Sequence, residues 1–264
     1  MKLGISSYTY TWAIENNNLG VKWLIDKAVE LDVHVLQIAD NLPLDRLSDS
    51  EINSLAKSAD NLDITIEVGT RGILNENLLT CLGIAERLKS HIVRVVVDTS
   101  EHQPSINEII DIVKPQMTEF ERAKISLAIE NHDRFTTKLL KQIIQGLDSE
   151  YVGVCLDCAN SFGAMEGPEV VFAELAPWAV NLHVKGFKIY RAKGNMGFII
   201  DGTSMQNSML NLSWILDKMK QSKHDVNVIL EQWTPFGDNI KSTIEKEENW
   251  AKESIKYMRE YITD

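Results

Sequence analysis

The sequence predicts a single (β/α)8 barrel domain over residues 1–264. Short apolar runs alternate with longer amphipathic segments eight times, a pattern typical of parallel strands joined by helical crossovers. The length of 264 residues suits such a barrel, which takes about 250 residues. The apolar runs also share a common inward face, and no change in composition marks a second domain.

The expected strands are short apolar runs, each followed by a turn and a helical segment. They are Leu3–Ser7, Val33–Ala39, Asp63–Gly69, Ile92–Asp98, Ile125–Glu130, Tyr151–Asp157, Ala179–Val184 and Val226–Glu231.

The segments between the strands are expected to be helices. Ser48 with Glu51 forms a capping box at the start of one of them, and Pro168 suits the first turn of another. The expected helices are Gly20–Leu31, Ser48–Asn61, Asn75–Leu88, Ile106–Ala123, Thr136–Leu147, Pro168–Leu175, Asn207–Gln221 and Ile240–Tyr261.

Strand parity predicts which side chains face the barrel interior. Successive strand residues point to opposite faces. In the fifth strand Leu127 and Ile129 therefore oppose Glu130, and in the seventh Leu182 opposes His183. The large apolar residues face the surrounding helices, while the small and polar ones face inward.

The overall charge disfavours a nucleic-acid partner. The chain has 27 Lys plus Arg against 38 Asp plus Glu, a net charge of −11 that repels phosphate backbones. It contains no apolar run long enough for a membrane span, and Met1 leads directly into a strand-like segment. We therefore expect a cytoplasmic protein with no membrane partner.

Three acidic side chains and one imidazole close four successive strands. A single acid at a strand end is often only a helix cap. Several carboxylates brought together at the top of a barrel, however, are desolvated and repel one another unless a cation joins them. We therefore expect a divalent-metal site formed by Glu130, Asp157, His183 and Glu231.

The ligand types suit one hard or borderline ion. Three carboxylates and one imidazole favour Mn²⁺, with Mg²⁺, Co²⁺ or Zn²⁺ as alternatives. Open positions on the ion would accept oxygens of a small polyhydroxylated keto substrate and stabilise an enediolate. Glu130 and Glu231 are the expected catalytic residues, because each could exchange a proton with the substrate.

The strand ends AIENHD, CLDCAN, NLHVKGF and ILEQW resemble those of the xylose isomerase-like TIM barrel family, which includes ketose 3-epimerases, dehydratases and endonuclease IV. The resemblance implies one divalent ion on Glu130, Asp157, His183 and Glu231. In the epimerase branch it also implies that both glutamates exchange protons with the substrate. Family members are often dimers or tetramers, so the resemblance is consistent with a homo-oligomer.

The sequence departs from the epimerases at two substrate-contact positions. Asn160 stands where they carry a histidine, and Ile189 stands where they carry an arginine, with Arg191 two residues further on. Endonuclease IV is disfavoured because its three-zinc cluster needs several more histidines.

Further substrate-binding residues are expected around the barrel mouth: His132, Asn160, Lys185, Arg191, Trp12 and Glu67. For Glu67 the alternative is a purely structural pair with Arg94. Tyr10 is a further candidate for the pocket wall. The glycine-containing stretch Lys185–Met205 is expected to form a lid over the site.

Three functions follow from these patterns. The first is a metal-dependent isomerase or epimerase that acts on a small sugar-like keto compound through an enediolate. The second is a metal-dependent lyase, either a dehydratase or a decarboxylase, acting on a keto sugar acid or inosose. The third is a non-catalytic sugar-binding module.

Overall fold

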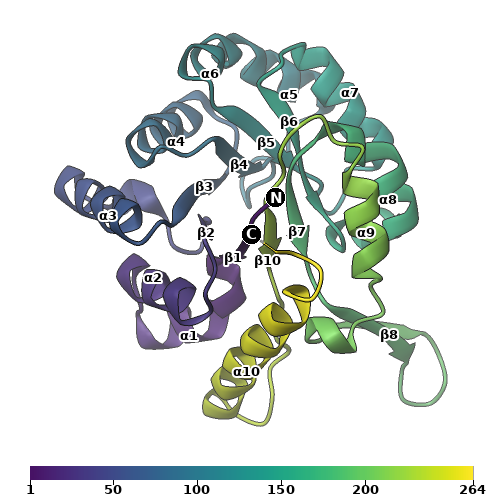
Figure 1. The fold of residues 1–264 in the computed structure, drawn as a ribbon. Coiled ribbons are helices and arrows are strands. Elements are labelled where there is room, and N and C mark those ends of the chain that lie inside the picture. The colour runs from purple at the N-terminus through teal and green to yellow at the C-terminus, as the bar shows by residue number, and fades with distance from the viewer. Residues whose placement is uncertain (264) are drawn as a thin grey trace.

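The computed structural model describes residues 1–263 and contains a closed barrel of eight parallel strands (Figure 1). Around the barrel the order is β1-β2-β3-β4-β5-β6-β7-β10. The strands are β1 (Leu3–Ser6), β2 (Val35–Ile38), β3 (Thr65–Arg71), β4 (Ile92–Val96), β5 (Ser126–Glu130), β6 (Val152–Asp157), β7 (Ala179–Val184) and β10 (Val228–Leu230). The predicted fold class is confirmed.

The helices surround the barrel, and the chain begins next to β1 (Figure 1). The helices are α1 (Thr11–Asn17), α2 (Val21–Glu30), α3 (Asp49–Asn61), α4 (Asn75–Leu88), α5 (Ile106–Val113), α6 (Met117–Ala123), α7 (Thr137–Leu147), α8 (Pro168–Leu175), α9 (Leu212–Met219) and α10 (Ile240–Met258). The capping box of Ser48 and Glu51 is present at the start of α3.

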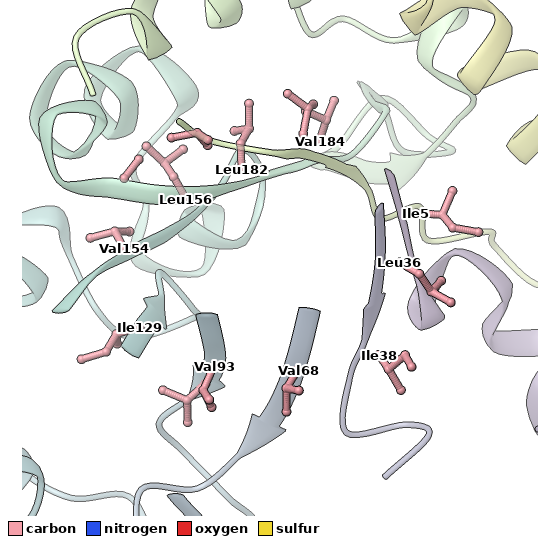
Figure 2. Close-up of a cluster of buried hydrophobic side chains, with 14 of the residues drawn as sticks. Ile5, Leu36, Ile38, Val68, Val93, Ile129, Val154, Leu156, Leu182 and Val184 are labelled. Carbon is pink, nitrogen blue, oxygen red and sulfur yellow. The ribbon is translucent and has the colours of Figure 1, made fainter. Parts of the chain in front are cut away.

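The large apolar residues of the strands pack outward against the helices, as strand parity predicts. Figure 2 shows such residues, among them Val93, Ile129, Val154 and Leu182, arranged around the outside of the barrel. The lower barrel interior is filled by a separate small cluster of Ile92, Ala128, Cys155 and Val180. The polar inward positions therefore gather toward the carboxyl ends of the strands.

Several segments differ from the prediction, among them helix α1 (Thr11–Asn17), which was not expected. The expected helix Ile106–Ala123 is interrupted by a 3-10 turn at Lys114–Gln116, where Pro115 lacks the N–H that a continuous helix needs. The stretch Lys185–Met205, expected as a lid, contains an antiparallel hairpin of β8 (Phe187–Arg191) and β9 (Phe198–Gly202). The hairpin projects from the barrel (Figure 1).

None of the helices formed by residues 1–263 is both long and apolar enough to cross a membrane.

Candidate metal centre

The four side chains expected to bind a metal converge at one end of the barrel. Their strands β5, β6, β7 and β10 are consecutive neighbours. Glu130 and Asp157 end β5 and β6, and His183 is the penultimate residue of β7. Glu231 directly follows β10, and its backbone N donates to the carbonyl of Val184 at 3.1 Å. One ligand atom from each of the four side chains lies within 4.8 Å of the others, and all four residues are buried.

The spacing of these atoms fits a single small ion. His183 Nδ1 lies 3.1 Å from Glu231 Oε2, 3.5 Å from Glu130 Oε2 and 3.7 Å from Asp157 Oδ2. Ligand atoms bound at about 2.1 Å to one ion stand roughly 3.0–3.5 Å apart. Nδ1 of His183 is buried without a hydrogen-bond partner and faces the three carboxylates. The donor set therefore fits a divalent ion.

The orientation of His183 follows from hydrogen bonds beneath the four ligands. Gln37 Nε2 donates to Glu67 Oε2 at 3.1 Å, so the other end of this amide, Oε1, faces His183 Nε2 at 2.7 Å. Because that oxygen only accepts, Nε2 carries a proton, and Nδ1 is the nitrogen that would bind an ion. Glu67 is held in turn by Asn181 at 2.9 Å and Asn227 at 2.8 Å.

Replacing Gln37 with alanine is expected to weaken Mn²⁺ binding by about 10–100-fold, the range found when a partner of a ligand is removed. The imidazole would lose the acceptor that fixes its tautomer. Isothermal titration calorimetry measures the affinity, and Gln206→Ala on the exposed surface serves as the control. Equal affinity in Gln37→Ala and the wild type would show that Gln37 does not set the tautomer.

Both carboxylate oxygens of Glu130 are engaged by neighbouring side chains. Arg94, which is only 2% exposed, pairs through Nε with Oε2. Asn160 Nδ2 donates to Oε1 at 2.6 Å. Arg94 also contacts Asp40 at 3.1 Å, which in turn pairs with Arg71 at 2.9 Å. Arg94 is thus a partner of Glu130 and Asp40, and the alternative pair of Arg94 with Glu67 is replaced by these contacts.

Lys185 brings a second cation into the site. Its Nζ lies 2.7 Å from Glu231 Oε2 and 3.0 Å from Asp157 Oδ2, and it donates to Asn160 Oδ1 at 3.1 Å. Burial alone would raise the pKa of Glu231, but Lys185 and His183 hold it well below its usual range. Burial alone would lower the pKa of Lys185, but Asp157 and Glu231 raise it well above its usual range. Lys185 also lowers the pKa of Asp157. The carboxylates of Glu231 and Asp157 and the Lys185 ammonium are therefore charged at neutral pH.

A cavity of about 310 Å³ opens above these residues. Four of the six expected substrate-binding residues line it: Trp12, His132, Asn160 and Lys185. The cavity is also lined by the candidate ligands Glu130 and Glu231 and by Tyr8, Thr11, Arg71, Arg94, Gln232, Trp233 and Thr234.

The other two expected substrate-binding residues lie elsewhere. Arg191 is exposed on the β8–β9 hairpin and stacks on the ring of Phe198 at 4.2 Å, because the segment forms a hairpin that carries it outward. Glu67 is buried beneath the ligands in the amide network described above. Tyr10 is core and packs edge-on against Trp23 at 5.2 Å between ring centroids.

The pocket wall formed by Trp12 is held in place by a buried acid on α10. Trp12 Nε1 donates to the carbonyl of Thr234 at 2.6 Å, and its ring lies 5.3 Å from that of Phe236. Glu247 accepts from the backbone N of Trp12 at 3.0 Å and from that of Ala13 at 2.9 Å. Burial raises the pKa of Glu247 to about 7, although these two N–H donors act in the opposite direction.

This pKa predicts a pH-dependent contribution to stability. A carboxyl whose pKa is higher in the folded state stabilises the fold most below its unfolded value, and this contribution is lost as pH rises toward 7. The stability of the wild type relative to Glu247→Gln is therefore expected to fall by about 3 kcal/mol between pH 4.5 and pH 7. Urea unfolding across this range measures the difference. Glu245→Gln, at an exposed position on the same helix, is the control. Parallel stability curves for the wild type and Glu247→Gln would contradict the assignment.

Comparisons with known proteins agree with this fold. The family of xylose isomerase-like TIM barrels matches residues 25–261. A 3-oxo-isoapionate decarboxylase of Pectobacterium atrosepticum is 28% identical over 261 residues, covering 98% of this chain and 95% of that protein. Two solved structures share the fold. One is the IolI protein with a bound zinc atom, which is 16% identical with a TM-score of 0.71 and covers 100% of both chains. The other is D-psicose 3-epimerase with D-tagatose from Clostridium cellulolyticum, which is 17% identical with a TM-score of 0.71 and covers 98% of this chain and 97% of that one.

Proposed function

Because the chain belongs to the xylose isomerase-like TIM barrel family, we propose that it is a divalent-metal-dependent lyase that decarboxylates a small 3-oxo sugar acid. The observation that carries the proposal is the buried ammonium of Lys185, which lies between two candidate ligand carboxylates and faces the cavity. The likeness to a 3-oxo-isoapionate decarboxylase supports the same reaction class.

The charges of the site favour an anionic substrate. Glu130, Asp157, Glu231 and Asp40 carry four negative charges, and Arg94, Lys185 and Arg71 return three positive ones. A divalent ion would leave the buried site with one positive charge in excess. Buried charges are stable only when they are paired, and a single substrate carboxylate would restore neutrality.

The contacts of Glu130 favour loss of CO₂ over abstraction of a proton. A general base needs a carboxylate oxygen free to take a proton from carbon. Arg94 and Asn160 already engage the two oxygens of Glu130. Decarboxylation needs no base at the bond-breaking step, since the electron pair comes from the broken carbon–carbon bond.

The reaction can be written with the residues of this chain. The Lys185 ammonium pairs with the substrate carboxylate and so lies close to the carbon from which that carboxylate leaves. Glu130, Asp157, His183 and Glu231 would hold a divalent ion, Mn²⁺ by preference with Mg²⁺, Co²⁺ or Zn²⁺ as alternatives, and that ion would supply a Lewis acid for the 3-oxo group. The bond between the carboxylate and its neighbouring carbon breaks, CO₂ leaves, and the electron pair forms an enediolate. The Lys185 ammonium then gives a proton to that carbon and regains one from water.

The cavity suits a substrate of this size and polarity. Tyr8, Trp12 and Trp233 provide flat walls for sugar carbons, and His132 and Arg71 can contact hydroxyl oxygens at the rim. We assign Asn160 to the substrate contacts as well, because it lies between Lys185 and Glu130.

Isomerisation or epimerisation is the second candidate. It is favoured by the presence of two ligand glutamates, Glu130 and Glu231, on the same cavity. In that case one glutamate would remove a proton next to the carbonyl and the other would return it.

A turnover screen tests the proposal. The Mn²⁺-loaded protein is incubated with 3-oxo sugar acids, ketoses and inososes, and CO₂ is measured by a coupled assay. We expect CO₂ from at least one 3-oxo acid, with a ketose as the other product. Epimerisation of a ketose with no CO₂ from any acid would refute the lyase assignment.

A further inference from the structure

Lys185 and the expected metal ion share the same two oxygens. The ammonium contacts Glu231 Oε2 at 2.7 Å and Asp157 Oδ2 at 3.0 Å. The same two oxygens also face His183 Nδ1, at 3.1 Å for Glu231 and 3.7 Å for Asp157, within the group of four ligand atoms. An ion bound there would sit beside the ammonium, and both are positively charged.

The other oxygen of each carboxylate already accepts hydrogen bonds. Asp157 Oδ1 accepts from the backbone N of Ala159 and of Asn160, each at 2.8 Å. Glu231 Oε1 accepts from Ser6 Oγ at 3.2 Å. Neither carboxylate can therefore rotate to bind the ammonium with one oxygen and the divalent ion with the other unless these hydrogen bonds break.

We propose that Lys185 acts as a built-in counter-ion for the metal site, and that binding of the divalent ion displaces its ammonium toward the cavity. There it becomes free to hold the anionic group of the substrate. The order of assembly is therefore ion first and substrate second. That the freed ammonium holds the substrate rests on the proposed function, whereas its displacement by the ion does not.

Asn160 provides a position for the displaced ammonium. Its Nδ2 is fixed on Glu130 at 2.6 Å, so its Oδ1 faces Lys185 at 3.1 Å. Both Asn160 and Lys185 line the cavity. The ammonium can thus leave the two carboxylates and keep one hydrogen-bond acceptor.

The first test measures Mn²⁺ affinity by titration calorimetry in the absence of substrate. Lys185→Met keeps an apolar stem of similar length but has no charge to compete with the ion. We expect it to bind Mn²⁺ roughly tenfold more tightly than the wild type, within the usual range of coupling between two ligands. Lys188→Met, at an exposed position on β8, should leave the affinity unchanged. Equal or weaker affinity in Lys185→Met would overturn the proposal.

A second test uses the wild-type chain, in case Lys185→Met does not fold. Reductive methylation of lysines is followed by mass spectrometry with and without Mg²⁺. Lys185 should react several-fold faster when the ion is present, because its ammonium has left the two carboxylates. An unchanged or slower reaction would overturn the displacement. Neither test needs turnover, so both remain decisive if the decarboxylase assignment fails.

Discussion

Arg94→Met is expected to destabilise the protein by about 3–5 kcal/mol, the usual effect of removing one partner of a buried ion pair. Arg94 is 2% exposed and pairs with Glu130, which has no exposed side-chain surface. Asp40 keeps Arg71 and the Tyr8 hydroxyl as partners, so Glu130 loses the most. Urea unfolding monitored by circular dichroism, without added metal, measures the change.

A double variant separates the charge effect from the packing effect. In Arg94→Met with Glu130→Gln the unpaired carboxylate is gone, and part of the lost stability should return. Arg122→Met, which removes a surface pair with Glu119, should change stability by no more than about 1 kcal/mol. If Arg94→Met behaves like Arg122→Met, Arg94 is not the buried counter-charge of the site.

Asp157→Asn is expected to weaken Mn²⁺ binding by more than about 100-fold, beyond the range typical of outer partners of a ligand. Asp157 Oδ1 is held by the backbone N–H groups of Ala159 and Asn160. The amide oxygen of an asparagine would take those bonds, and its NH₂ group would face the ion in place of Oδ2. Electron paramagnetic resonance of free Mn²⁺ measures the loss.

Cys155 provides the control for this experiment. Its sulfur also lies close to Glu130 and His183 and could in principle complete another ligand group. However, its thiol contacts Asn181 at 3.4 Å, and burial raises its pKa to about 11. Cys155→Ala should therefore retain Mn²⁺ affinity. A large loss in Cys155→Ala with little change in Asp157→Asn would place the ion on the thiol group instead.

Much of the site could be predicted because the barrel repeats one rule. Each strand ends at the same face, so the last inward residue of a strand must point into the mouth. This rule is enough to predict that Glu130, Asp157, His183 and Glu231 converge. It predicts Lys185 only as a residue of the barrel mouth, and the ion pairs of Lys185 with Asp157 and Glu231 appear only in the structure. Parity alone also separates the outward core from the inward polar residues.

Other features depend on packing between strands distant in sequence. The bond between Gln37 and His183 joins residues 146 positions apart and requires the barrel to close in one register. The engagement of Glu130 by Arg94 depends on which of several inward carboxylates lies nearest. Arg191 is expected at the barrel mouth as part of a lid, but two runs of its segment pair as a hairpin, and Arg191 does not line the cavity.

The position of deuterium after turnover in D₂O tests the central claim most directly. The lyase account predicts one deuterium on the carbon that carried the carboxylate, with none in the recovered substrate, because no proton is removed before the bond breaks. Nuclear magnetic resonance of product and recovered substrate gives both values in one experiment. Deuterium in a substrate whose carbon skeleton is intact would contradict the account and show that the site works by abstracting a proton.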